Sequence, residues 1–298
     1  MSDPTFGLSL VPTLDVAAHR ELARTADENG LEWLGIQDHP YVPRFLDAFV
    51  LAGDLLAATS RIHVFPDVAN LPLRPPAVLA KTAASLDLVS GGRFDLAVGA
   101  GGFWDAIVGM GVERRTRAEA NAALEEAFAI MRGIWRGDEP VRHRGVHYTV
   151  EGLSAGPAPA HPIELWTGAQ GPRALALTGR IADGWAAPIP KYLPYEQWAA
   201  ANAVLDDAAI AAGRSPAAVR RIAQVVGTIT DGREALDVTA GEAPVRGSAA
   251  QWTEFLTFLG TELPYTTFVF WPEQQTVDQV LRFARDVVPA VREGLGRA

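Results

Sequence analysis

Short apolar and β-branched runs alternate with longer amphipathic stretches along nearly the whole chain. Runs of the first kind predict buried strands, and stretches with one apolar face predict helices. The predicted strands are 5–11, 31–37, 62–68, 94–98, 163–166, 184–187, 222–229 and 267–271. The predicted helices are 15–29, 45–58, 76–89, 113–135, 173–181, 195–212, 249–259 and 277–291. Eight strands that are each followed by a helix predict the α/β class and a single (β/α)8 TIM barrel over residues 1–298.

Two segments interrupt this regular alternation. Residues 141–150 predict a small hairpin with Arg144-Gly145 at its turn, which makes it an insertion after strand four and its helix. Residues 99–111 are rich in glycine and predict a loop.

Composition narrows the range of partners and compartments. The net charge of −9 argues against nucleic acid as the main partner, since phosphate neutralisation requires a basic face. No apolar run is long enough to span a membrane, and Met1 is not followed by a basic leader region, so we expect a cytoplasmic protein. The chain has no cysteine, which excludes disulfides, thiolate metal sites and iron–sulfur clusters.

Function in a barrel concentrates at the C-terminal ends of the strands. Polar residues and glycines follow four of the predicted strands: Asp38-His39, Asp67-Val68-Ala69, Gly99-Ala100-Gly101 and Gly168-Ala169-Gln170-Gly171. We expect these segments to form one site.

His39 is the strongest catalytic candidate, with Asp38 beside it. A histidine exchanges protons near neutral pH, although His39 is also compatible with a structural role as a helix cap.

The glycines at 168–171 precede a helix and suit an anion held by backbone N–H groups, but an ordinary tight turn has the same composition. The other histidines are expected to be structural or solvated. No His-x-His or His-Glu-x-x-His spacing occurs, so we expect no metal and give a barrel metallohydrolase little support.

Several longer motifs together are more specific than any one loop. They are Gln37 to Pro40, Asp67 to Pro76, Ser85 to Leu96, Gly99 to Gly101, Trp166 to Gly171 and Ala182 to Trp185. With these motifs the chain resembles the bacterial luciferase-like family of flavin- and F420-dependent oxidoreductases. Within that family it is similar to the methylenetetrahydromethanopterin reductase branch.

The resemblance implies a barrel with an insertion after strand four that forms homodimers. It also implies a non-proline cis peptide at Asp67-Val68 behind the cofactor ring, and Asp38-His39 facing that ring. Gly168 to Gly171 would hold the cofactor phosphate. Asp67 departs from the small residue usual at its position, so we expect its side chain to point into the barrel wall. With Lys81 and Lys191 as the only lysines, the oligoglutamate tail of F420 would fall to Arg173, Arg44 or Arg74.

Two cofactors and several functions remain open on this resemblance. F420 implies hydride transfer to or from a small organic substrate, and FMN implies a two-component monooxygenase. A separate flavin or F420 reductase would be a partner wherever the cofactor must arrive reduced. A flavin-binding barrel without catalysis is an alternative of another class. The substrate pocket is expected between Phe103, Trp104, Pro188 and residues 192–195, which suits a flat or alicyclic molecule.

Overall fold

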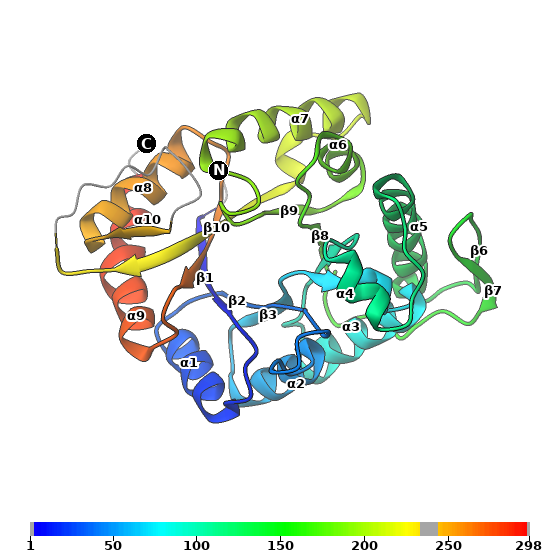
Figure 1. Ribbon diagram of the computed structural model, residues 1–298, viewed down its shortest axis with the longest axis horizontal. Helices are drawn as coiled ribbons and strands as arrows, with labels where there is room; N and C mark the ends of the chain where they lie inside the picture. Colours follow the sequence, from blue (N-terminus) through cyan, green and yellow to red (C-terminus); the bar gives the residue numbers. More distant parts are fainter. Residues whose placement is uncertain (1–2, 233–243, 297–298) are drawn as a thin grey trace.

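The computed structural model describes residues 3–232 and 244–296. Met1 and Ser2, where the sequence predicted no leader, lie outside the described residues. Eight parallel strands form its barrel (Figure 1). They are β1 (Thr5–Leu10), β2 (Trp33–Ile36), β3 (His63–Pro66), β5 (Leu96–Gly99), β8 (Leu165–Thr167), β9 (Gly184–Ala187), β10 (Arg220–Ile229) and β12 (Thr267–Pro272). The predicted α/β barrel is confirmed.

The sheet closes between β3 and β5. Strand pairing runs continuously from β3 through β2, β1, β12, β10, β9 and β8 to β5. A parallel bridge between Val64 and Phe94 then joins the two ends of this order. At this seam the Val64 N–H donates to the Arg93 carbonyl at 2.9 Å, and the Asp95 N–H donates to the Val64 carbonyl at 3.1 Å.

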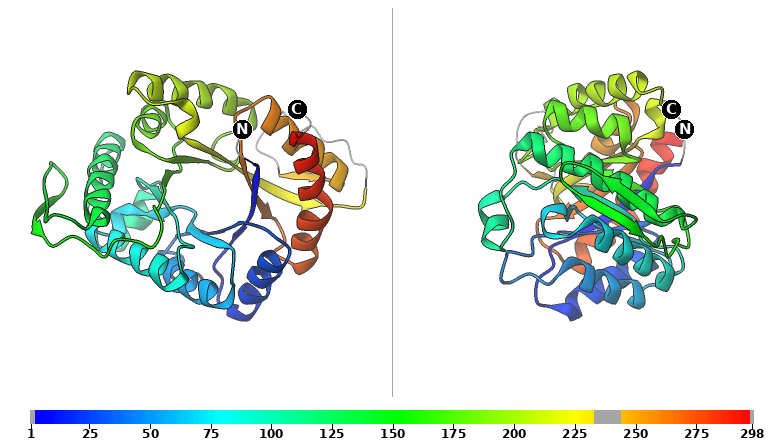
Figure 2. Two further views of the ribbon diagram at one scale, coloured as in Figure 1. Left: turned by 180° about the vertical axis from the view of Figure 1, so that it is seen from behind. Right: turned by 90° about the vertical axis from the view of Figure 1, so that its right-hand side faces the viewer.

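Helices surround the strands, as the views from front, back and side show (Figures 1 and 2). They are α1 (Val16–Glu28), α2 (Ala48–Ala58), α3 (Pro76–Ser90), α4 (Trp104–Gly109), α5 (Arg117–Arg136), α6 (Pro172–Ile181), α7 (Trp198–Ala211), α8 (Ala249–Thr261), α9 (Val277–Arg282) and α10 (Val288–Gly296). Short 3₁₀ helices occupy Leu71–Leu73, Tyr195–Gln197 and Pro216–Ala218, and a π turn over Phe283–Val287 joins α9 to α10. Within the described residues, no helix is long and apolar enough to cross a membrane.

Two clusters of buried side chains hold these layers together. The larger one packs the helices against the outside of the sheet. The smaller one takes one residue from each of seven barrel strands and fills the interior: Trp33, Phe65, Ala97, Trp166, Ala186, Ile222 and Val269. The eighth strand contributes Gly7, where a Cβ atom would stand 2.6 Å from both the Cβ atom and the carbonyl oxygen of Trp33, so the glycine allows the two strands to approach closely.

The predicted insertion is confirmed as a hairpin of β6 (Val141–Arg144) and β7 (Thr149–Leu153), which projects from the ring beside α5 (Figures 1 and 2). The predicted loop over 99–111 is wrong in part, because it contains helix α4. Trp104 to Val108 hold neither glycine nor proline, and the fully buried Ile107 anchors this short helix.

Other elements also differ from their predicted ranges. The long helix starts at Arg117 rather than at residue 113, because Thr116 and Glu119 form a capping box. The predicted strand 62–68 ends at Pro66, and the chain pairs again only at β4 (Ala69–Asn70). The short strand β11 (Val245–Gly247), which pairs with β10, was not predicted.

Candidate functional site at the C-terminal ends of the strands

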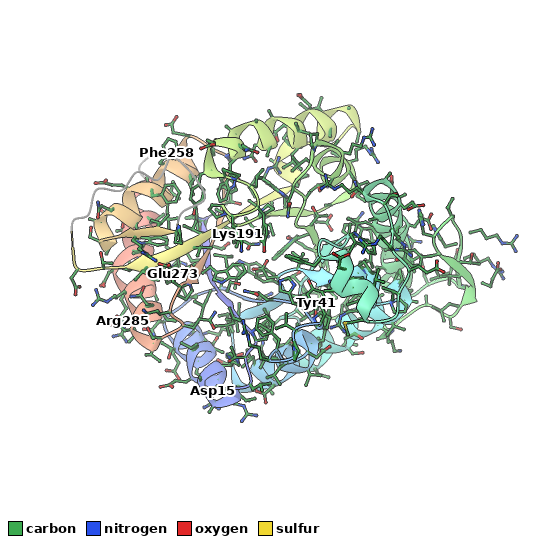
Figure 3. All side chains as sticks on the ribbon, in the orientation of Figure 1. Asp15, Tyr41, Lys191, Phe258, Glu273 and Arg285 are labelled. Carbon is green, nitrogen blue, oxygen red and sulfur yellow. The ribbon has the colours of Figure 1, made fainter. Side chains whose placement is uncertain are left out.

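A cavity of about 840 Å³ opens at the C-terminal ends of the barrel strands. All the predicted site residues line it: Asp38, His39, Asp67, Val68, Ala69, Gly99, Ala100, Gly101, Gly168, Ala169, Gln170 and Gly171. The structure therefore gathers them in one place, while the role of each remains a prediction. Figure 3 places Tyr41, which also lines the cavity, inside the ring of outer helices and beside α4.

His39 stands half-buried on the cavity wall. Its Nδ1 atom lies 2.7 Å from the Tyr41 hydroxyl, and its ring meets the Phe103 ring edge-to-face at 5.5 Å between centroids. Among the described residues, the Nε2 atom has no hydrogen-bond partner. Burial lowers the pKa of His39, and the charge of Asp38 only partly offsets this, so the ring is neutral at neutral pH.

Asp38 points into the protein, although it neighbours His39 in sequence and reaches the cavity wall. Its side chain is buried, and its carboxylate accepts bonds from Arg74 at 3.0 and 3.2 Å and from the Asn70 N–H at 2.8 Å. Arg74 also pairs with Asp47 at 2.8 Å and lies 4.2 Å from the centroid of the Phe49 ring. Arg74 is thus engaged by two carboxylates, which argues against its predicted role in binding an oligoglutamate tail.

The peptide bond between Asp67 and Val68 is cis, as the family resemblance implied. The Asp67 carboxylate turns into the barrel interior, where it accepts hydrogen bonds from Ser9 at 3.0 Å and Gln224 at 2.7 Å. The expectation that this acid points away into the barrel is confirmed. Burial raises the pKa of Asp67 to about 6, although both hydrogen bonds favour the charged form.

The glycines leave backbone exposed around Val68. A Cβ atom at Gly99 would lie 2.8 Å from the side chain of Val68, and one at Gly168 would lie 3.3 Å from it. Gly101 has a φ of +105°, and a Cβ atom there would come within 2.9 Å of the Pro72 ring. Side chains at these positions would displace the cavity wall, so the close approach of the two loops to Val68 depends on glycine.

The loop from Gly168 to Gly171 leads into helix α6, and no side chain caps the first turn of this helix. The exposed Arg173 lies in that turn and lines the cavity. Arg117, at the start of α5, lines the same cavity, and in the described part of the chain neither arginine forms an ion pair. Free backbone N–H groups and two available cations make this part of the cavity suitable for an anion.

Several residues of the cavity wall were not among the predicted site residues. They are Asn70, Tyr41, Arg117, Asn121, Gln197 and Gln224. Asn70 is buried, and its Oδ1 atom has no hydrogen-bond partner within the described residues. Asn70 belonged to the strand-three motif, so its position was visible in the sequence, but the unpaired oxygen is visible only in the folded chain.

The predicted substrate pocket is confirmed in part. Phe103, Trp104, Pro188 and Tyr192 line the cavity, and the rings of Phe103 and Tyr192 are 6.3 Å apart. Tyr195 does not line it, contrary to the prediction for residues 192–195. Its ring packs in the core against Trp198 and Phe255, at centroid distances of 4.9 and 5.2 Å.

Solved structures with this fold include three oxidoreductases. The F420-dependent tetrahydromethanopterin reductase of Methanopyrus kandleri is 19% identical with a TM-score of 0.81, and the match covers 97% of this chain and 99% of that one. An F420-dependent secondary alcohol dehydrogenase with an F420–acetone adduct is 18% identical, has a TM-score of 0.83 and gives the same coverage. A monooxygenase from Streptomyces bottropensis is 20% identical with a TM-score of 0.80 and covers 96% and 99%. At these identities the likeness concerns the fold.

Curated relatives share more of the sequence over a shorter stretch. An uncharacterized protein of Mycobacterium tuberculosis is 31% identical over 195 residues, which are 62% of this chain and 66% of the relative. An F420-dependent glucose-6-phosphate dehydrogenase of Nakamurella multipartita is 32% identical over 171 residues, 55% of this chain and 50% of that protein. The chain thus matches half to two thirds of their length. A family model described as luciferase-like monooxygenase matches residues 4–278, so the chain belongs to the luciferase-like family of oxidoreductases.

Proposed function

We propose that this chain is an F420-dependent oxidoreductase that exchanges a hydride with a small organic substrate in the cavity at the strand ends. The observation that carries the proposal is the convergence, in one cavity, of a neutral histidine with a free Nε2 atom and three glycine-lined backbone segments. The F420-dependent relatives named above support the choice of cofactor.

The residues present fit such a cofactor. The unpaired Oδ1 atom of Asn70 can accept a hydrogen bond from the N–H groups that flavin-type rings carry on their pyrimidine edge. The N–H groups of Gly168 to Gly171 would hold the phosphate at the start of α6. Arg173 and Arg117 would then face the acidic tail, whereas Arg74 would not.

When bound, F420 supplies hydride transfer, and the protein supplies position and proton movement. The neutral His39 ring would present Nε2 as the proton acceptor for a substrate hydroxyl. Tyr41 would fix the orientation of this ring because its hydroxyl oxygen accepts the Nδ1–H, which leaves Nε2 without a proton. Asp38 would act as a positioning residue, because its carboxylate holds the Asn70 N–H and Arg74 instead of reaching a substrate.

FMN is the second candidate cofactor. The matching family model is described as a monooxygenase, and one structural neighbour is a monooxygenase from Streptomyces bottropensis. This alternative would make the chain one component of a pair, with a separate reductase as its partner.

Titration of the purified protein with F420 and with FMN, followed by fluorescence quenching, separates the two proposals. We expect F420 to bind at least about tenfold more tightly, which corresponds to about 1.4 kcal/mol. Tighter binding of FMN would favour the monooxygenase, and failure of both cofactors to bind would reject both proposals. Small alcohols and sugar phosphates are the first substrates to test, by loss of the absorbance of oxidised F420.

A substitution at His39 tests the mechanism. His39→Gln should lower F420 reduction by at least about 100-fold and leave F420 affinity within a few-fold, because it removes a proton acceptor and keeps the cavity shape. His143→Gln is the control, because it makes the same change on the inserted hairpin, and His143 does not line the cavity. Unchanged turnover in His39→Gln would remove His39 from the mechanism.

We further propose a homodimer of single-domain barrels in the cytoplasm, formed through α2 and α3. These neighbouring helices expose Val50, Val78, Leu88 and Val89, with 73%, 60%, 44% and 80% of each residue accessible. Light scattering on wild type and on Val89→Glu tests the dimer, which the introduced charge should dissociate.

A further inference from the structure

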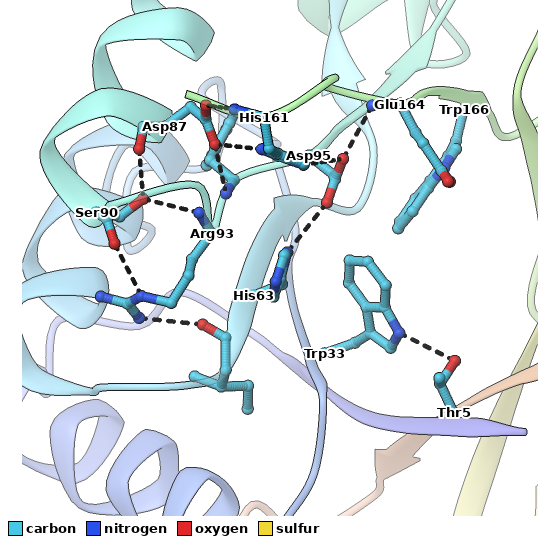
Figure 4. A network of polar contacts seen from close by, with 12 residues as sticks. Thr5, Trp33, His63, Asp87, Ser90, Arg93, Asp95, His161, Glu164 and Trp166 are labelled. Carbon is cyan, nitrogen blue, oxygen red and sulfur yellow. Dashed lines mark hydrogen bonds and ion pairs between the residues drawn. The ribbon is translucent and has the colours of Figure 1, made fainter. Parts of the chain in front are cut away.

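Four titratable side chains gather at the end of the barrel opposite the cavity (Figure 4). His63 is the first residue of β3, Asp95 directly precedes β5, and His161 lies just before β8. His63 and His161, which the sequence led us to expect as structural or solvated, thus lie in one cluster. Their ligand atoms and those of Asp95 all lie within 4.8 Å of one another, and Asp87 contacts His161 from α3.

The distances within this cluster fall into two classes. Asp95 lies 3.3 Å from His63 Nδ1 through one oxygen and 3.3 Å from His161 Nε2 through the other. Charge-assisted hydrogen bonds are shorter, about 2.7–2.9 Å. Ligands at the corners of a tetrahedron with Zn–N bonds of about 2.0–2.1 Å stand about 3.3–3.4 Å apart, which is the length of each contact. The two contacts involve different oxygens of Asp95, and one ligand atom from each of the three residues lies within 4.8 Å of the others.

The contact between Asp87 and His161 is of the other kind. Asp87 Oδ1 lies 2.6 Å from His161 Nδ1, a short hydrogen bond that leaves Nε2 directed at Asp95. A carboxylate that accepts the second ring N–H of a histidine is the usual outer partner of a metal-bound imidazole, where it fixes the tautomer and the ring orientation.

The charges of the cluster also call for a cation. Asp87 is fully buried and Asp95 is 2% exposed, and in the described part of the chain neither pairs with lysine or arginine. The nearby Arg220 is held by Glu164 through two contacts of 2.9 Å. His161 is thus the basic partner that the two buried carboxylates share, and a divalent ion that replaces its ring proton would add one positive charge to balance them.

We infer that His63, Asp95 and His161 bind a divalent transition-metal ion of the Zn²⁺ class, with Asp87 orienting His161. The histidine side chains remain 31% and 27% exposed, so an ion and a water as fourth ligand can reach the site. His63 and Asp95 flank the Val64–Phe94 bridge that closes the barrel. The ion would therefore hold this seam together, in keeping with the stabilising role of the N-terminal face of barrels.

Titration with Zn²⁺ tests the inference directly. The protein is prepared without a histidine tag, stripped with a chelator, and titrated against a chromophoric chelator at about pH 8.5. This pH is needed because the ion displaces a proton from His161, whose pKa is raised to about 9 by Asp95 and then Asp87. We expect a single equivalent of Zn²⁺ to bind, no comparable binding of Mg²⁺, and a rise in Tm that the chelator reverses.

Substitutions localise the ion. Loss of an outer partner typically weakens metal binding about 10- to 100-fold, so we expect Asp87→Asn to lower the Zn²⁺ affinity by a factor in that range. His63→Gln and His161→Gln each remove a ligand and should lower the Zn²⁺ affinity by about 100-fold or more. His143→Gln is the matched control, because His143 lies 3.3 Å from a single carboxylate, that of Glu126. Wild-type affinity in both histidine variants would refute the site. If those variants fail to fold, the wild-type protein still tests the site. The site is refuted if the wild type shows no saturable Zn²⁺ binding, or if it binds Mg²⁺ as tightly as Zn²⁺.

Discussion

The carboxyl group of Asp67 is buried in the barrel interior between Ser9 and Gln224. We predict that Asp67→Asn stabilises the protein at neutral pH. Asparagine has nearly the same shape and can still exchange hydrogen bonds with both partners, because the Gln224 amide can turn. What it lacks is the charge, which the folded protein has to bury.

The size of the effect follows from the pKa of Asp67, which burial raises from 3.8 to about 6. Between these values the unfolded chain has lost the proton and the folded chain keeps it, so stability falls as pH rises through this window. The full loss above about pH 6 is about 3 kcal/mol, at about 1.4 kcal/mol for each pKa unit. About half of this loss in the free energy of unfolding has occurred by pH 5. We therefore expect a further loss of about 1.4 kcal/mol between pH 5 and pH 8.

Urea unfolding of wild type and Asp67→Asn, without cofactor, at pH 5 and pH 8 measures this difference. Other groups titrate alike in both proteins, so the stability gap should widen in favour of Asp67→Asn as pH rises. Asp27→Asn is the control: Asp27 is also buried, but N–H groups of residues 60–62 bind its carboxylate and lower its pKa. Asp27 is therefore ionised in the folded and the unfolded chain at both pH values, so Asp27→Asn should destabilise the protein equally at pH 5 and pH 8. A gap for Asp67→Asn that stays constant or narrows towards pH 8 would refute the reasoning.

Three further outcomes are expected. Arg74→Met leaves the two carboxylate partners uncompensated and should cost about 3–5 kcal/mol in urea unfolding, and a loss below about 1 kcal/mol would contradict the buried ion pair. Tyr41→Phe removes the partner of His39 and should lower F420 reduction about tenfold at unchanged F420 affinity, and wild-type turnover would exclude this positioning role. Gly101→Ala puts a side chain at a φ of +105° and should cost about 1–3 kcal/mol and weaken F420 binding, whereas Gly102→Ala, with open space around it, should do neither.

The order of strands and helices could be predicted from the sequence because each element carries its own periodicity. Boundaries were less accurate, since they depend on single side chains. The capping box of Thr116 and Glu119 delays the start of α5, and the three residues of β11 are too few to show a pattern. The bridge between Val64 and Phe94 joins the third and fourth barrel strands, which are consecutive, as the predicted (β/α)8 barrel requires.

The location of the candidate site could be predicted because the C-terminal ends of all barrel strands meet at one face, and this does not depend on the side chains at that face. The partner of each side chain could not be predicted in the same way. Arg74 lies 36 residues from Asp38 in sequence, and Gln224 lies 157 residues from Asp67. His63 and His161 come together for the same reason, through strands that begin side by side around the Asp95 carboxylate.

Neighbouring residues on extended backbone direct their side chains to opposite sides, and this explains why Asp38 and His39 do not act as a pair. Asp38 turns inward to Arg74, and His39 turns to Tyr41 at the cavity wall. Because the carboxylate is committed to Arg74, it cannot also orient the histidine, and that task falls to a tyrosine two residues further on. In the proposed mechanism the two neighbouring residues therefore have separate roles: Asp38 fixes the loop, and His39 is left free for the substrate.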